Sequence, residues 1–169
     1  MLKLSHYYCE NIIEIQIKEK AMNILILEDD LYTSEIMKED IELCLNKVIE
    51  PLSITVCNTI YDANNAIEKI DFDYIISDLN MNPDGLDEFY LDETLGAIAT
   101  GWVWVHHYVL EKDKDTFIIF YSAFTDTLKN IEEYQKYAIK SKILDKCNYD
   151  SSDIAKFILD HKKECLKTE

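Results

Sequence analysis

The sequence contains no arginine, so all 17 of its basic residues are lysines, and 33 acidic residues oppose them. The formal net charge of −16 argues against nucleic acid as a partner, because binding to phosphates requires a cationic surface. Glycine and proline are also scarce, with 3 and 2 residues, which argues against collagen-like, linker-rich and many-turned all-β architectures. No apolar run reaches the roughly 18 residues of a membrane-spanning helix, so no membrane partner is expected.

The five cysteines match neither a disulfide framework nor a zinc-ligand pattern. Their number is odd, their spacings are wide and no Cys-x-x-Cys pair occurs. The first ten residues lack the apolar core of a signal peptide, so a reducing cytoplasm is the expected compartment. A hydrophobic fraction of 48% is sufficient for a folded core, and the length of 169 residues fits one domain of ordinary size.

Short apolar runs alternate with helical periodicities along the chain. The runs predict five strands, at residues 24–27, 52–57, 74–77, 116–121 and 142–144. Apolar spacings of three and four residues predict helices at residues 31–49, 59–70, the second half of 88–111, 125–138 and 151–164. This alternation predicts an α/β protein in which a parallel sheet carries helices on both faces.

Polar side chains follow the predicted strands and form a candidate site. They are Glu28, Asp29 and Asp30 after the first strand, Asp78 after the third, Ser122 after the fourth and Lys146 after the fifth. Taken singly, each is also typical of a solvated strand end or a turn. Together they should gather at the carboxyl ends of the strands, where sheets of this kind bind ligands. Acids around a hard cation, with a hydroxyl and an ammonium group nearby, suit phosphoryl transfer.

The sequence around these residues resembles the receiver domain of bacterial two-component response regulators. Four motifs occur in the right order: I-L-I-L-E-D-D at 24–30, D-Y-I-I-S-D-L-N-M-N-P-D-G at 73–85, I-I-F-Y-S-A at 118–123 and I-L-D-K at 143–146. The resemblance covers roughly residues 22–163. It implies a three-layer α/β/α fold like that of a stand-alone chemotaxis regulator, with a five-stranded parallel sheet in the flavodoxin-like order 2-1-3-4-5.

The resemblance also implies roles for the site residues and partners for the protein. Asp78 would accept a phosphoryl group, Ser122 would hydrogen-bond it and Lys146 would pair with it. Mg²⁺ is the implied cofactor, held by Glu28, Asp29, Asp78 and the backbone carbonyl of Asn80. The implied phosphoryl donor is a sensor histidine kinase or a phosphotransfer protein, and the output passes to a downstream protein partner. We therefore expect a stand-alone phosphoacceptor with no output domain, rather than a dedicated enzyme.

Two other functions stay open at this point. A degenerate receiver would bind partners without phosphorylation, because Cys147 stands where the family usually has proline and Ile143 where it often has an aromatic residue. A phosphatase of the haloacid-dehalogenase type also places an aspartate after an apolar strand. It needs a second acid two positions later, where this chain has Asn80. A flavin-binding protein of the same fold is disfavoured, because no Ser/Thr/Gly-rich phosphate loop follows the first strand.

The expected domain spans residues 22–165, after an N-terminal extension at residues 1–21. Within the extension, isoleucines at positions 13, 15 and 17 alternate with polar residues. This alternation is typical of a strand. The extension is therefore interpreted as an extra edge strand or as a leader upstream of Met22, and composition does not distinguish the two.

An enlarged third-helix region at residues 88–111 is the second departure from the family. Asp78 and Ser122 lie 122 − 78 = 44 positions apart, more than is usual for the family. On a helix, residues 102–105 sweep about 300°, so the large apolar side chains of this region, Trp102 and Trp104 among them, cannot all face one sheet. We therefore expect a surface for a partner or for a homodimer here, with core packing as the alternative. The adjacent His106 and His107 would point about 100° apart, which makes them a poor metal pair at a helix edge.

Overall fold

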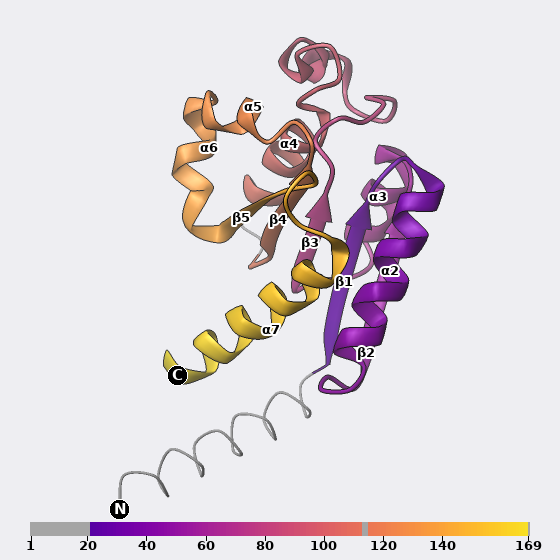
Figure 1. Cartoon of the computed structure of the whole chain (residues 1–169). Helices are drawn as coiled ribbons and strands as arrows, with labels where there is room; N and C mark the ends of the chain where they lie inside the picture. Colours follow the sequence, from indigo (N-terminus) through magenta and orange to yellow (C-terminus); the bar gives the residue numbers. More distant parts are fainter. Residues whose placement is uncertain (1–20, 113–114, 169) are drawn as a thin grey trace, which may run out of the picture.

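A five-stranded sheet forms the middle layer of the computed structural model, which describes residues 21–112 and 115–168 (Figure 1). Its strands are β1 (Met22–Leu27), β2 (Leu52–Cys57), β3 (Tyr74–Ser77), β4 (Phe117–Ser122) and β5 (Ser141–Asp145). Every neighbouring pair runs parallel, in the order β2-β1-β3-β4-β5. The predicted fold class and strand order are confirmed.

The strands form where short runs of β-branched and aliphatic residues can be buried on both faces. All four residues of β3 are buried, as a central parallel strand requires when helices cover both sides. The bounds of β2 and β3 are those predicted from the sequence. β1 begins two residues before its predicted start, and β4 and β5 differ from prediction by one residue at each end.

One face of the sheet is covered by α2 (Leu31–Leu45) and α7 (Ser151–Thr168), which also pack against each other (Figure 1). Their core residues interdigitate with β1, and include Ile41 of α2 and Ile154 and Ile158 of α7. The first helix ends four residues before its predicted end at Ile49. The chain turns there instead, and the N–H groups of Val48 and Ile49 both donate to the Leu45 carbonyl.

The other face is covered by a larger number of shorter elements. These are α3 (Ile60–Ile67), α4 (Thr100–Trp104), the π-helix η2 (Val105–Leu110), α5 (Asp126–Lys129) and α6 (Glu132–Tyr137). The 3₁₀ helix η1 (Glu88–Thr94) packs against α4, and the 3₁₀ turn η3 (Ala138–Lys140) leads from α6 into β5. Thr59 caps the start of α3: its Oγ1 accepts the Asp62 N–H at 3.0 Å and donates to the Asp62 carboxylate at 2.7 Å. The pair stabilises the start of that helix.

The prediction of one continuous helix at residues 125–138 was wrong, because the structure has two shorter helices there, α5 and α6. The Asn130 side chain donates to the carbonyl of Asp126, the first residue of α5, at 3.1 Å. Ile131 then has an extended backbone, with φ −94° and ψ 114°, before α6 begins. A local side-chain hydrogen bond therefore competes with the helix that the apolar spacing favours.

The tryptophans of the enlarged region are buried, contrary to the expected outward-facing surface. Trp102 is 4% exposed and Trp104 is fully buried. Trp102 lies among the rings of Phe120 and Tyr134, and Trp104 Nε1 donates to Asn64 Oδ1 of α3 at 2.8 Å. Both tryptophans find cover because α3 and α6 flank α4 on this face. The exposed large apolar residues of the region lie earlier in the chain, at Phe89, Leu91 and Leu95.

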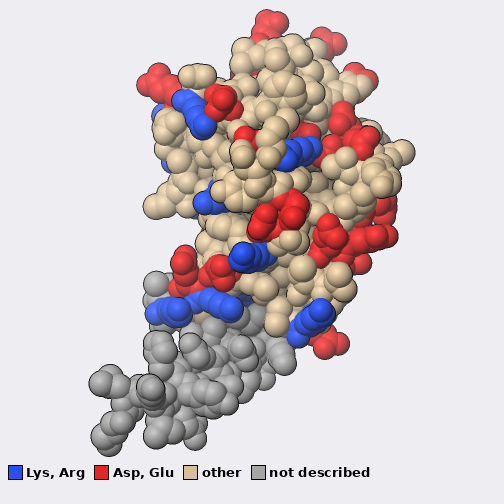
Figure 2. All heavy atoms as spheres, viewed as in Figure 1, with Lys and Arg blue, Asp and Glu red and all other residues tan. Residues whose placement is uncertain are grey.

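The predicted extension lies outside the described residues except for Ala21, and its interpretation stays a prediction, as do the domain bounds. No helix in the described ranges is both long enough and apolar enough to cross a membrane. Acidic side chains gather on the side of the molecule where α2 lies (Figure 2). That helix contributes Glu35, Glu39, Asp40 and Glu42.

Candidate functional site

Three charged residues begin the loops at the carboxyl edge of the sheet. Glu28 follows β1, Asp78 follows β3 and Lys146 follows β5. The last residues of β1 and β3 are paired in register, and the Asp78 N–H donates to the Leu27 carbonyl at 2.9 Å. The Lys146 N–H similarly donates to the Ser122 carbonyl at 3.2 Å. Parallel pairing therefore brings residues that are distant in sequence to one edge.

The Lys146 ammonium bridges the two carboxylates. Its Nζ lies 2.6 Å from Glu28 Oε2 and 2.6 Å from Asp78 Oδ2. Glu28 is 3% exposed and Asp78 9% exposed, so both acids are held in a largely dry environment. Without the lysine, their charges would repel each other with little screening by water.

Burial and neighbouring charges have opposing effects on the pKa values of Glu28 and Lys146. Burial raises the pKa of Glu28 above its usual range, and the nearby Asp78 charge raises it further, while Lys146 acts in the opposite direction. Burial by itself would lower the pKa of Lys146. The hydrogen bonds and charges of Asp78 and Glu28 outweigh that effect and raise it, so the ammonium stays protonated.

The Asp78 carboxylate is fixed by its own loop. Its Oδ1 accepts the backbone N–H of Leu79 at 2.6 Å and that of Asn80 at 3.2 Å. These bonds hold Oδ1 toward the backbone and turn Oδ2 toward Lys146. The arrangement presents one oxygen of an oriented carboxylate beside a cation, which is suited to attack on an electrophile that carries negative charge.

The other predicted site residues lie nearby without joining this contact. Asp29 and Asn80 are exposed, and Asp29 Oδ2 accepts the Asn82 N–H at 3.4 Å. Ser122 is fully buried at the end of β4, and its Oγ accepts the Phe124 N–H at 3.2 Å. The structure thus brings together Glu28, Asp78 and Lys146. The roles assigned to Asp29, Asn80 and Ser122 stay predictions.

The acids at this edge have donor chemistry that fits a magnesium ion. Carboxylate and carbonyl oxygens are the ligands that Mg²⁺ prefers, and it usually keeps several waters while binding one or two carboxylates. The oxygens of Glu28, Asp29 and Asp78 do not all come within 4.8 Å of one another, as judged over residues 21–112 and 115–168. A hydrated ion, which needs fewer direct carboxylate ligands, therefore fits better than a fully dehydrated one.

Sequence reasoning missed Gly101, which brings α4 against the back of the site. A Cβ at this position would lie 1.8 Å from the Asp78 carbonyl oxygen and 2.7 Å from Ser77 Oγ. The Gly101 N–H also donates to the Leu79 carbonyl at 3.0 Å. A lone glycine inside an apolar helical stretch is the sequence sign of such a close approach. The enlarged region is therefore joined to the backbone of Asp78.

Two further residues support the site from neighbouring elements, and neither was predicted. The Asn58 amide donates to the Glu28 carbonyl at 2.7 Å and to Ser34 Oγ at 3.0 Å, which ties the β2 loop to the end of β1. The ring of Tyr121, one residue before Ser122, lies 5.5 Å from the Lys146 ammonium, within cation–π range. No motif in the sequence marks either contact.

Comparison with solved structures identifies the fold. The receiver domain of the Francisella response regulator 1452 is 19% identical, with a TM-score of 0.59, over 88% of this chain and 99% of that one. Vibrio cholerae chemotaxis protein CheY4 is 18% identical, with a TM-score of 0.53, over 82% and 97%. The Thermotoga maritima response regulator TrrA, in complex with Mg²⁺-BeF, is 18% identical, with a TM-score of 0.50, over 87% and 97%.

The sequence itself matches no protein-family model and no curated protein. The chain nevertheless has the fold of response-regulator receiver domains, which the four sequence motifs predicted. These likenesses span nearly the full length of the receiver domains compared.

Proposed function

We propose that this protein is a phosphorylation-controlled signalling receiver whose phosphoacceptor is Asp78. The observation that carries the proposal is the contact of Lys146 with Asp78 and Glu28 at the carboxyl edge of a receiver fold. It supports an active site over a degenerate one, because the lysine reaches both acids although Cys147 follows it in place of proline. A haloacid-dehalogenase reaction finds no support, since Asn80 offers no acid two positions after Asp78.

Asp78 Oδ2 would attack the phosphorus atom of a phosphohistidine. The new O–P bond forms as the P–N bond breaks, and the leaving nitrogen takes up a proton from solvent. The Lys146 ammonium would pair with an oxygen of the transferred group, and Ser122 would rotate to donate a hydrogen bond to it. Glu28, Asp29, Asp78 and the Asn80 carbonyl are the residues that would hold Mg²⁺. When bound, the ion would offset negative charge on the phosphoryl oxygens.

The phosphoryl donor would be a sensor histidine kinase or a phosphotransfer protein, and output would pass to a downstream protein. The exposed apolar residues Phe89 and Leu95, which are 73% and 57% exposed, are a candidate contact surface for that partner. A homodimer through residues 88–111 stays a prediction. Sedimentation of the protein with and without phosphorylation tests it.

The first prediction concerns the phosphoacceptor. The protein incubated with a small phosphodonor and Mg²⁺ should gain the mass of one phosphoryl group, and hydroxylamine should remove it, as expected of an acyl phosphate. Asp78→Asn should abolish the gain, because the amide is not a nucleophile of this kind while its size and shape are preserved. Intact-mass spectrometry is the measurement.

Asp84→Asn is the matched control, because Asp84 is an exposed acid in the loop that follows Asp78. It should gain the phosphoryl group like the unmodified protein. A label that survives Asp78→Asn, or that sits on a serine or histidine, would contradict the assignment. If the folded wild-type protein takes up no phosphoryl group at all, the degenerate receiver becomes the better reading.

A further inference from the structure

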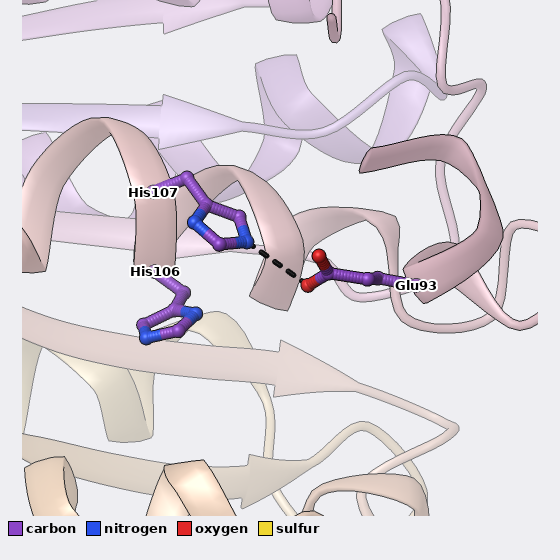
Figure 3. A group of neighbouring side chains, drawn as sticks. All are labelled: Glu93, His106 and His107. Carbon is purple, nitrogen blue, oxygen red and sulfur yellow. Dashed lines mark hydrogen bonds and ion pairs between the residues drawn. The ribbon is translucent and has the colours of Figure 1, made fainter. Parts of the chain in front are cut away.

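A second cluster of ligand-type side chains lies in the enlarged region, away from the phosphoacceptor. Glu93 comes from η1, and His106 and His107 come from η2 (Figure 3). Each residue offers one ligand atom, and these atoms all lie within 4.8 Å of one another. In the part of the chain that the structure describes, no other three His, Cys, Asp or Glu residues meet this spacing.

The two histidines lie close together in the π-helical turn η2. Adjacent residues of an α-helix point about 100° apart, which is why the sequence argued against a metal pair. In the structure the two ring centroids are only 4.5 Å apart. One nitrogen of each ring also lies within 4.8 Å of the other. The structure therefore places the two rings closer together than the prediction of a poor metal pair assumed.

Aromatic neighbours hold both imidazoles in place. The His106 ring stacks on Trp102, with centroids 5.0 Å apart and planes at 9°. The His107 ring stacks on Tyr90, with centroids 3.8 Å apart and planes at 11°. The two histidine side chains are only 12% and 10% exposed. Rings fixed in this way lose little further freedom when they bind an ion, which favours affinity.

Each nitrogen of the His107 ring faces a carboxylate. Its Nδ1 lies 3.1 Å from Glu111 Oε2, and its Nε2 lies 2.9 Å from Glu93 Oε2. A histidine that binds a metal usually gives its other N–H to a carboxylate, which Glu111 provides here. Ligand atoms of a tetrahedral zinc site lie roughly 3.3–3.5 Å apart, given bond lengths of about 2.0–2.2 Å. The 2.9 Å between His107 Nε2 and Glu93 Oε2 would need to increase only slightly for both atoms to bind one ion.

We propose that Glu93, His106 and His107 bind a transition-metal ion of the Zn²⁺ type, with Glu111 orienting His107. Two imidazoles and one carboxylate favour such an ion over Mg²⁺ or Ca²⁺, which prefer oxygen ligands. A pocket of about 240 Å³, lined by Glu93, Trp102, His106 and Glu133 among others, adjoins the cluster. It leaves room for a water or a further ligand at the fourth position.

The bound ion would join η1 to η2 and so brace the enlarged region. Glu93 and His106 are 13 positions apart in the sequence, and η2 directly continues α4, whose Gly101 contacts the backbone of Asp78. The site itself does not depend on phosphorylation of Asp78, so its test is independent of the proposed function.

The test is metal binding by the full chain after treatment with a chelator. Isothermal titration calorimetry with Zn²⁺ should give a stoichiometry of one ion per chain. The Co²⁺-loaded protein should show the visible absorption bands of a tetrahedral site and no charge-transfer band from a thiolate ligand. Glu93→Gln, His106→Gln and His107→Gln should each weaken Zn²⁺ binding at least tenfold. Glu111→Gln should weaken it about 10- to 100-fold, as expected of an orienting partner.

His161→Gln is the matched control, because His161 lies near Cys165, with Nε2 3.8 Å from Sγ, and could supply a competing site. It should leave Zn²⁺ binding unchanged. Circular dichroism establishes that each variant is folded. Binding lost in His161→Gln but kept in His107→Gln would overturn the proposal. So would a thiolate band in the Co²⁺ spectrum, or wild-type protein that binds neither ion.

Discussion

Lys146 lies between two carboxylates that the fold places on neighbouring strands. Both contacts are 2.6 Å, and the acids are nearly inaccessible to water. An ion pair of this kind adds little net stability when complete, since desolvation offsets the attraction. Removing one partner is a different matter, because it leaves buried charge uncompensated. The cost of a change at Lys146 thus depends on Glu28 and Asp78 more than on the lysine itself.

The prediction at this scale is that Lys146→Met lowers the free energy of unfolding by about 2–3 kcal/mol without divalent cations. This is somewhat less than the 3–5 kcal/mol typical of breaking a fully buried pair, because 22% of the Lys146 side chain is exposed. Urea denaturation is the measurement.

Lys129→Met is its control. Lys129 also contacts an acid at 2.6 Å, Asp126 Oδ1, but both side chains are largely exposed, so solvent screens the pair and no measurable loss is expected. Equal losses in the two variants would show that burial of the acids does not determine the effect.

At the scale of elements, α4 connects the enlarged region with the candidate site. It is short, every residue of it is buried, and it rests on the backbone at Asp78 through Gly101. The π-helix that follows it carries the two histidines, and η1 before it carries Glu93. One compact region therefore connects the backbone of Asp78, the proposed phosphoacceptor, with the proposed metal site.

Gly101→Ala tests this connection. In an ordinary helix interior the change gains about 0.5–1 kcal/mol. Here the new methyl group would meet the Asp78 carbonyl oxygen at 1.8 Å, so we expect a loss of at least about 1–3 kcal/mol, as for overpacking. Because the backbone of Asp78 must shift, phosphorylation by a small phosphodonor should also slow. Chemical denaturation and the rate of mass gain measure the two effects.

Gly96→Ala is the control that distinguishes the effect of backbone strain from that of steric contact with Asp78. Gly96 has φ +71° but no atom within 4 Å of its added Cβ, so backbone strain should cost stability while phosphorylation stays unchanged. A Gly101→Ala protein as stable as the wild type would mean that α4 can move away from Asp78 freely.

On the scale of the whole molecule, the net charge of −16 acts on every part of the fold. Like charges repel one another across a compact structure and destabilise it relative to the unfolded chain. The acidic residues of α2 lie close together on one side of the molecule (Figure 2). Dissolved ions screen such repulsion over roughly 10 Å at 0.1 M salt.

We therefore expect the thermal midpoint to rise when sodium chloride is added. Relief of about 1 kcal/mol would correspond to a rise of roughly 2–4 °C for a protein of this size. Differential scanning calorimetry between low salt and physiological ionic strength measures it. Choline chloride at equal ionic strength should act alike if screening is the cause. A midpoint that falls or stays level would mean that favourable ion pairs outweigh the repulsion.

The sequence determined the sheet and the chemistry of its edge. Each strand is a short run of aliphatic and β-branched residues between polar segments, and that local pattern sufficed to place β2 and β3 at their observed bounds. Glu28, Asp78 and Lys146 were predictable for the same reason, because a charged residue just after a buried strand has only one edge of the sheet to occupy.

Only the tertiary structure decided how the segments between the strands are covered. Periodicity gives the faces of a helix but not its neighbours, so it could not show that α3 and α6 bury Trp102 and Trp104. Nor could it reveal the π-helical turn that carries His106 and His107, or the break at Asn130. These outcomes depend on tertiary packing and on single side-chain hydrogen bonds, which the spacing of residue types along the chain does not encode.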